Sequence, residues 1–236
     1  MGGDAGGVQH GVHLDGLRDD LDHRRRDDEH RRAHPDAGQL MGQTWWFVAR
    51  ASGIVAWALL TTSVLWGLML STKVRPPRVR PAWTLDLHRF LGGTAAIFTG
   101  LHIGSVFLDS YVHFGPREIL VPFASTWKPA AVALGIVSLY LLLAVELTSL
   151  AKRRLPHRLW RRVHVLSLPL FFLATLHFVT AGTDAHGMLV LSAVLAATLA
   201  VVAGVALRIR QATRPAPARV PRVPSPVPVL PDPVRT

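Results

Sequence analysis

The sequence contains no cysteine among its 236 residues. Disulfides, Cys-ligated iron–sulfur clusters and thiol nucleophiles are therefore excluded. The Gly-x-Gly-x-x-Gly pattern that opens many dinucleotide-binding sites is also missing, so we expect no nicotinamide-binding module in this chain. The first 30 residues lack an apolar core after a basic start, so they do not resemble a secretory signal peptide.

Charged residues are almost missing from five long segments of the chain. About 20 apolar residues span a hydrocarbon core of ~30 Å as a helix, whereas a core helix of a soluble protein would show a polar face. The five segments cover about residues 45–71, 85–109, 129–150, 163–180 and 188–207. The predicted fold is all-α: an integral membrane bundle of five transmembrane helices, in a multi-pass protein of the plasma membrane.

The two ends of the chain differ in composition from these segments. Residues 1–44 are polar, Gly-rich and mixed in charge, which predicts a disordered tail. We hypothesise that Met41 is an alternative start, which detection of peptides from residues 1–40 would refute. Residues 209–236 are rich in Pro, Val and Arg and predict an extended, disordered C-terminal tail. The membrane domain is expected to cover residues 45–208.

The formal net charge of +11 would suit a nucleic-acid partner on a soluble domain. Here the basic residues outside the tails gather in two short loops between apolar segments. They are Lys73, Arg75, Arg78 and Arg80 in the first loop and Lys152, Arg153, Arg154, Arg158, Arg161 and Arg162 in the third. The positive-inside rule then predicts that both loops face the cytoplasm, with the N-terminus outside and the C-terminus inside. We expect a membrane and no nucleic acid as partner.

Four histidines lie within the second and fourth segments, where ionisable side chains are costly and usually serve a site. His88 and His102 are 14 residues apart, which gives nearly the same helix face and a rise of roughly 21 Å. His164 and His177 are 13 residues apart, a rise of roughly 20 Å. Because the two segments run parallel, His88 should lie level with His164, and His102 with His177. Two such pairs suit the axial positions of two haems standing between helices.

The spacing in the fourth segment requires a bend. Thirteen residues on a straight helix leave the side chains of His164 and His177 about 140° apart, so both could not face the second segment. Pro169 lies between them. A proline inside a helix removes a backbone hydrogen bond, and we hypothesise that the resulting kink supplies the missing rotation.

Other residues near the histidines have two readings each. Arg89, Arg161 and Arg162 at the cytoplasmic level and Arg50 at the outer level suit bidentate contacts to haem carboxylates, but they also suit ordinary membrane anchors. Four glycines of the second segment allow close approach of a flat ring or of a neighbouring helix. They are Gly92, Gly93, Gly100 and Gly104. Trp160 near a segment end is expected to belong to an interfacial aromatic belt.

The motifs around these histidines resemble those of the ferric reductase-like transmembrane domain, the cytochrome b core shared by membrane ferric reductases and NADPH oxidases. The resemblance rests on Leu87-His88-Arg89 with Gly92, on His102, on Trp160-Arg161-Arg162-Val163-His164 and on His177, and covers roughly residues 45–208. It implies two haems b, ligated by His88 with His164 and by His102 with His177. It also implies electron transfer from the inside to the outside.

Complete oxidases and reductases of this kind carry a cytoplasmic flavin and nicotinamide module after the membrane core, which this chain replaces by its Pro-rich tail. Flavin or NAD(P)H is therefore expected only on a separate partner, and the donor is a flavoprotein reductase, a quinol or a small redox carrier. The short core also resembles the haem-bearing membrane subunit of bacterial methionine-sulfoxide reductase systems, which implies an extracytoplasmic acceptor. We interpret the chain as the haem b membrane component of an oxidoreductase and assign no residue a catalytic role.

Two other functions fit the pattern less well. A membrane anchor or assembly subunit without cofactor would present its basic loops to a partner and would be colourless. A proton or metal transporter would use the histidine pairs with Glu146, but transporters commonly show internal repeats, and we find none in the sequence.

Overall fold

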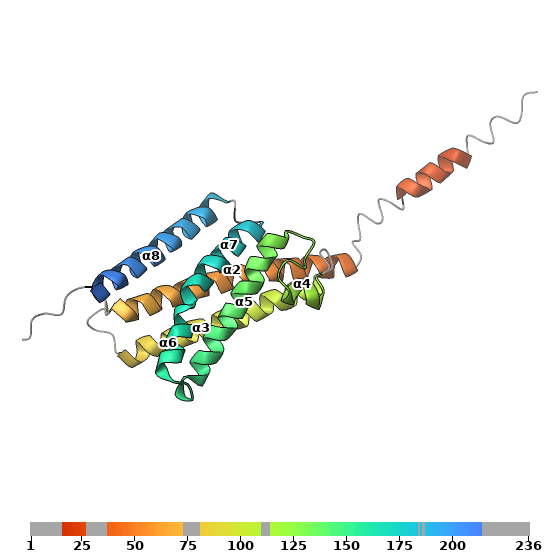
Figure 1. The fold of residues 1–236 in the computed structure, drawn as a ribbon. Helices are drawn as coiled ribbons and strands as arrows, with labels where there is room; N and C mark the ends of the chain where they lie inside the picture. The colour runs from red at the N-terminus through yellow and green to blue at the C-terminus, as the bar shows by residue number, and fades with distance from the viewer. Residues whose placement is uncertain are drawn as a thin grey trace, which may run out of the picture.

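The computed structural model describes residues 16–26, 37–72, 81–109, 114–183, 185 and 187–213, and within them every regular element is a helix. The elements are α2 (Ala37–Thr72), α3 (Pro81–Leu108), α4 (Pro116–Leu120), α5 (Pro129–Leu150), the short 3-10 turn η1 (Ala151–Arg153), α6 (His157–Val165), α7 (Ser167–Ala181) and α8 (Met188–Thr213) (Figure 1). Five helical stretches are long and apolar enough to cross a membrane, and α6 and α7 together make the fourth. The all-α fold with five membrane spans is confirmed.

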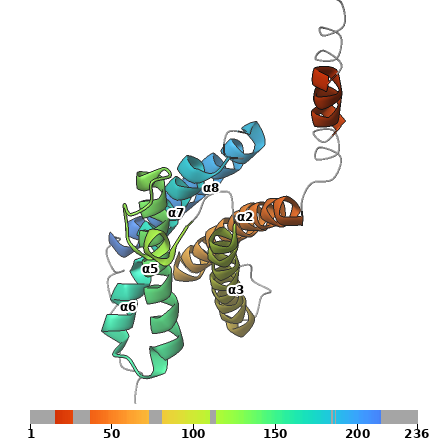
Figure 2. The ribbon, with the colours of Figure 1, turned by 90° about the vertical axis from the view of Figure 1, so that its right-hand side faces the viewer.

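The spans form a bundle in which α2 packs most extensively against α3, and α5 against α7. Helix α8 lies along α2 on the side away from α3 (Figures 1 and 2). The four membrane histidines lie on α3, α6 and α7, and α3 makes fewer close backbone contacts with α6 or α7 than the helices of any of these pairs make with each other. The histidine-bearing spans are therefore held in place mainly by their neighbours.

The apolar core lies between α2, α7 and α8. Val64, Leu68, Phe171 and Val201 form it, and Phe171 and Val201 are fully buried. A glycine at position 204 brings α8 close to Leu68, since a β-carbon there would lie 3.0 Å from Cδ1 of that leucine. This core fixes α7 against α2, and it includes no residue of α3.

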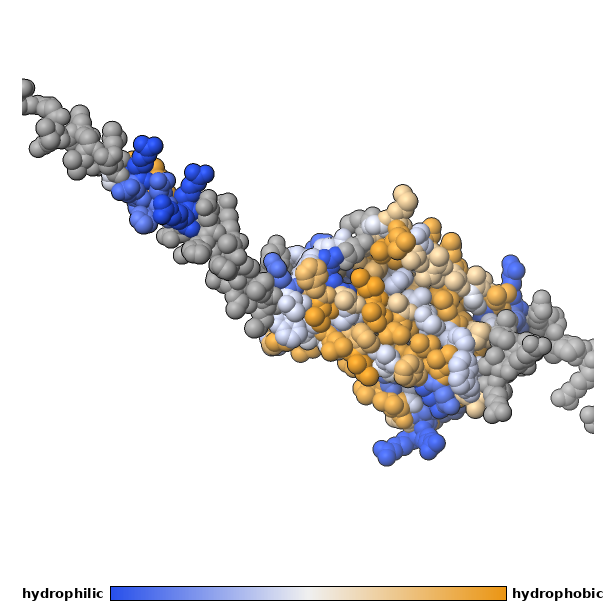
Figure 3. Space-filling model, turned by 180° about the vertical axis from the view of Figure 1, so that it is seen from behind, coloured by the Kyte–Doolittle hydropathy of each residue, from blue (hydrophilic) through white to orange (hydrophobic). Residues whose placement is uncertain are grey.

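The outside of the bundle is apolar. Many large hydrophobic side chains are exposed along the spans, such as Ile97 on α3, Leu147 on α5 and Leu195 on α8. Figure 3 shows hydrophobic residues over most of the side of the bundle, with strongly hydrophilic residues gathered toward its edges. An apolar surface of this extent is costly in water and suits a lipid environment.

The fourth span is interrupted, as the proline in it predicts. Helix α6 ends at Val165 and α7 begins at Ser167, with Leu166 as a single turn residue between them. The nitrogen of Leu166 donates to the carbonyl of Val163 at 2.9 Å, three residues back. Pro169 has no N–H to offer to the carbonyl of Val165, four residues before it, so the regular helix ends there.

Several helix ends differ from the sequence expectations. Residues 16–26, within the expected disordered tail, form an exposed helix in which Arg24 contacts Asp20 at 3.2 Å, an i,i+4 pair that favours helix. Helix α2 begins at Ala37 instead of 45, and α8 continues to Thr213, past the expected boundary at 208. The expected extended tail from residue 214 onward lies outside the described residues. Polar helical turns carry no apolar signal, so the apolar pattern could not find these ends.

Candidate functional site

The four membrane histidines meet as two pairs between α3 and the α6–α7 span. The ring centroids of His88 and His164 lie 5.9 Å apart, with an angle of 82° between the ring planes. Those of His102 and His177 lie 6.4 Å apart, with an angle of 74°. The pairs are those expected from the heights of the four residues along their helices. In this way each side chain reaches across the space between two helices whose backbones stand apart.

These separations match two imidazoles on opposite sides of one metal ion. An imidazole nitrogen binds a transition metal at about 2 Å, and the ring centre lies about 1 Å farther out, so two such rings have centres about 6 Å apart. Within the described residues, no group of three or more His, Cys, Asp or Glu could hold a metal ion by itself. A pair supplies only two ligands, which suits a metal whose other ligands come from a planar macrocycle.

Three of the four rings have one nitrogen bound to a backbone carbonyl of a neighbouring helix. The acceptors are Ala49 for His102 at 2.8 Å, Ala131 for His177 at 2.8 Å and Ser63 for His88 at 3.1 Å. A carbonyl can only accept, so Nδ1 of His102 and of His177 carries the proton and donates it. Nδ1 of His88 also lies 3.3 Å from the hydroxyl oxygen of Ser63, which can donate or accept. In His102 and His177 the remaining nitrogen, Nε2, then keeps its lone pair. This is the arrangement in which a histidine commonly ligates a metal.

A glycine follows each of these carbonyls four residues later in the sequence, and the same ring lies against it. We call this arrangement the carbonyl–glycine cradle. The three cradles are Ala49 with Gly53, Ser63 with Gly67, and Ala131 with Gly135. A β-carbon would lie 3.0 Å from Nδ1 of His102 at Gly53, 3.2 Å from Cε1 of His88 at Gly67 and 2.8 Å from Cε1 of His177 at Gly135. A β-carbon would force the ring to move at Gly135 and would crowd it at Gly53 and Gly67, so glycine suits all three positions.

The fourth ring has a different support. Ser149 stands 14 residues after Gly135 on α5, which is the spacing between Gly53 and Gly67 on α2. Nδ1 of His164 lies 3.4 Å from the hydroxyl oxygen of Ser149. A hydroxyl can donate or accept, so this partner does not decide which nitrogen of His164 carries the proton. His164 is thus the least constrained of the four rings.

The glycines singled out on the second span have other surroundings. A β-carbon at Gly93, Gly100 or Gly104 would meet no atom within 4 Å, so these positions border open space or the lipid-facing side. At Gly92 it would lie 2.6 Å from Oε1 of Glu146. The carboxylate of Glu146 therefore turns across to α3 inside the bundle.

Trp160 belongs to the site and not to an interfacial belt alone. Its ring, on α6, stacks on that of His164, with centroids 5.1 Å apart and an angle of 23° between the ring planes. Nζ of Lys152 lies 3.9 Å from the centroid of the Trp160 ring. Its Nε1 is buried and has no hydrogen-bond partner among the described residues. A buried N–H without a partner beside the His88–His164 pair suits a bound group that brings an acceptor.

The four arginines expected near bound carboxylates have the following surroundings. The guanidinium carbon of Arg50 lies 4.0 Å from the centroid of Trp46, and Arg89 contacts Asp86 at 3.4 Å. Arg161 and Arg162 line a shallow pocket of about 290 Å³ beside α6, and Arg161 also faces a second pocket shared with α8. Their role toward a haem stays a prediction.

Comparison with protein families decides what kind of chain this is. The family model for the ferric reductase like transmembrane component matches residues 52–175, more than half of the chain. The chain belongs to this family. The matched residues of this ferric reductase-like protein include His88, His102 and His164, both cradles of α2 except Ala49, and Ser149; His177 lies two residues beyond the match. Comparisons with curated proteins and with solved structures find no match.

The sequence reading of this ferric reductase-like chain found the four histidines and missed their supports. A signal for the supports exists: Gly53 and Gly67 repeat the 14-residue spacing of His102 and His88 on the adjacent, antiparallel span. When two packed helices carry glycines and histidines at the same spacing, each histidine can meet a glycine at its own level. The role of Trp160 in contacting His164 could be found only from the structure, because several other tryptophans also lie near span ends.

Proposed function

We propose that this ferric reductase-like membrane protein carries electrons across the membrane through two haems b, one held by His88 and His164 and one by His102 and His177. The observation that supports it best is that the same two spans form two histidine pairs, with ring centroids 5.9 Å apart in one pair and 6.4 Å apart in the other. Membership of the family and the five membrane spans support the same function. When bound, haem iron supplies reversible one-electron chemistry.

The residues of this chain would orient and enclose the ligands. Carbonyls on α2 and α5 hold three of the histidines by Nδ1, which would leave Nε2 of each ring available to ligate the haem iron. The glycines of the cradles let the rings lie deep between the helices. An apolar surrounding would keep water away from the space between the two levels, and such burial tunes the potential of a redox centre.

We further propose that electrons enter at the end of the bundle that carries α6 and its arginines and leave at the other end. The positive-inside rule supports this direction, since α6 and the loop before it are rich in Lys and Arg. The donor would be a separate flavoprotein reductase, a quinol or a small redox carrier. The acceptor would be extracytoplasmic, and the chain would serve as the membrane component of an oxidoreductase.

Haem content per chain tests the ligand assignment. The purified protein in detergent should show a Soret band that sharpens and shifts on reduction with dithionite. Replacing His102 or His177 by Ala should remove one of the two haems by a pyridine haemochrome assay and leave the other. His157→Ala provides a matched control, because this histidine lies on the same membrane span as His177 and belongs to neither pair; it should keep the full haem content.

Two results would contradict the proposal. A colourless protein from haem-sufficient cells would instead support a membrane anchor without cofactor. A His102→Ala protein with the same haem content as the His157→Ala control would show that the ligands lie elsewhere.

A further inference from the structure

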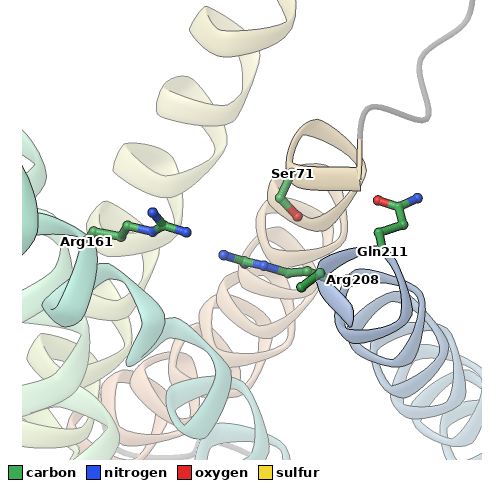
Figure 4. A pocket seen from close by; sticks show the side chains of 5 residues that line it. Ser71, Arg161, Arg208 and Gln211 are labelled. Atoms are coloured by element: carbon green, nitrogen blue, oxygen red, sulfur yellow. The ribbon is translucent and has the colours of Figure 1, made fainter. Parts of the chain in front are cut away.

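A pocket of about 450 Å³ lies where α2, α6 and α8 meet at the arginine-rich end of the bundle. Its lining consists of Ser71, Arg161, Arg208, Gln211 and Ala212. Figure 4 shows Arg161 and Arg208 extending toward each other from two different helices, with Ser71 and Gln211 on the α2 and α8 side. These residues come from three elements far apart in the sequence, so the fold alone brings them together.

The charge of the pocket calls for an anion. Two guanidinium groups face one space, and the lining includes no carboxylate. Among the described residues, neither the guanidinium of Arg161 nor that of Arg208 has a hydrogen bond or an ion pair, whereas the guanidinium of Arg89 contacts Asp86. Like charges repel, and an oxyanion between them would offset this repulsion and accept from both planar groups. An anionic oxygen ligand therefore fits better than a cation or an apolar ligand.

The level of the pocket indicates where such an anion comes from. Ser71 is the last residue but one of α2, and Gln211 and Ala212 lie in the last turn of α8. The ends of spanning helices lie where the hydrocarbon meets the lipid headgroups, and basic pockets between spans at this level bind anionic headgroups. The large side chains of Leu207 and Ile209 on α8 are about half exposed nearby, and they offer an apolar surface for acyl chains.

The size and the hydrogen bonding of the pocket narrow the ligand further. Ligand pockets for whole small molecules have about 300–1,000 Å³, much more than one carboxylate or one free phosphate fills. The hydroxyl of Ser71 already donates to the carbonyl of Leu68 at 2.8 Å, so its oxygen is left to accept. A ligand that combines a phosphate with a hydroxyl group would meet both the arginines and this acceptor.

We propose that this pocket binds the headgroup of an anionic phospholipid, with the phosphate diester between Arg161 and Arg208 and headgroup hydroxyls at Ser71 and Gln211. Arg208 lies close enough to His164 to interact with it electrostatically, but lipid binding in this pocket does not depend on the proposed electron transfer. A lipid seated there bridges α2, α6 and α8 and stabilises their arrangement at this end of the bundle.

Native mass spectrometry of the full chain can count the lipids that it retains. The protein would be titrated in detergent with phosphatidylglycerol and, separately, with zwitterionic phosphatidylcholine. We expect one tightly bound phosphatidylglycerol and no comparable phosphatidylcholine. Arg208→Gln should weaken phosphatidylglycerol binding about tenfold, because hydrogen bonds to a charged group are lost. Arg210→Gln, on the same helix with the same change in charge, lies outside the lining and should bind as the unmodified chain does.

Other outcomes would overturn the assignment. Equal weakening by Arg210→Gln would reduce the effect to general surface charge. Displacement of the lipid by millimolar inorganic phosphate would identify a site for free anions, and loss of haem together with lipid in Arg208→Gln would identify a haem carboxylate as the anion. If Arg208→Gln does not fold, Arg208→Lys keeps the charge without the planar fork and should still bind several-fold more weakly; unchanged binding would refute the site.

Discussion

The side chain of each cradle glycine is a single hydrogen atom, which leaves room for the histidine ring that lies against it. At Gly135 a β-carbon would come within 2.8 Å of two atoms of the His177 ring, closer than real contacts allow. The ring cannot move back freely, because its Nδ1 is bound to the carbonyl of Ala131 on the same helix. Position 135 is therefore as restrictive as the histidine itself.

We predict that Gly135→Ala loosens the haem held by His102 and His177. Overpacking of this kind costs about 1–3 kcal/mol, which corresponds to a loss of affinity of roughly five- to 150-fold. This loss is measured as the decrease in Soret absorbance when the protein is diluted and heated. Gly93→Ala is the control: no atom lies within 4 Å of its β-carbon, and alanine favours helix, so this protein should be as stable as the unmodified chain or more so. Equal haem retention by the two variants would refute the cradle.

At the residue scale, the sequence predicts the histidines much better than their supports. A histidine inside an apolar span is conspicuous because it is costly there, whereas a glycine in a membrane helix is common. Which glycine touches a ring depends on the register between α2 and α3, which no local pattern determines. In the sequence, Trp160 likewise resembles the other tryptophans near span ends, and its contact with His164 is what sets it apart.

At the scale of the helices, the interruption between α6 and α7 lets one span aim two histidines at one neighbour. Because the break lies at Leu166, between His164 and His177, the two halves need not share one continuous helical phase. The packing of Phe171 against α2 and α8 fixes the second half, and the contact of α6 with α5 fixes the first.

We predict that Pro169→Ala damages the alignment of the two pairs. The new N–H can bind the carbonyl of Val165 and continue α6 into α7, which turns His164 away from His88. The variant should lose haem from the His88–His164 pair, or shift its low-spin electron paramagnetic resonance signal, while the other haem is retained. Pro129→Ala is the control, since Pro129 stands at the first position of α5, where no intrahelical bond is missing. Identical spectra for both variants would show that the break does not depend on Pro169.

The apolar pattern predicts the number and type of the helices and misses where several of them end. The expected spans overlap all five observed ones, because about 20 apolar residues with so little charge have few alternatives. The basic α6 was expected to be a loop, but it is helical and strongly amphipathic, and its charges lie on one face. The break in the fourth span was expected because proline acts locally, through a bond that it cannot make.

At the scale of the whole molecule, the distribution of charge predicts how the bundle sits in the membrane. The α6 end carries many Lys and Arg, and the segment of residues 181–187 at the other end carries none. We therefore expect the α6 end in the cytoplasm. The fold itself is compatible with either direction.

The absence of cysteine makes this direction directly measurable. A single cysteine in place of Arg154 should react with a membrane-impermeant maleimide only after the cells are opened, and one in place of Thr183 should react in intact cells. The unmodified chain, which has no thiol, gives the background for both. The reverse labelling pattern would invert the proposed direction of electron flow and leave the two histidine pairs unaffected.

The spacing of the two cradles on α2 restricts insertions and deletions within this helix. Gly53 and Gly67 serve two levels from one rigid rod, so inserting or deleting one residue between them turns one cradle by about 100° relative to the other. The number of residues between Gly53 and Gly67 therefore cannot change without a compensating change between His88 and His102 on α3.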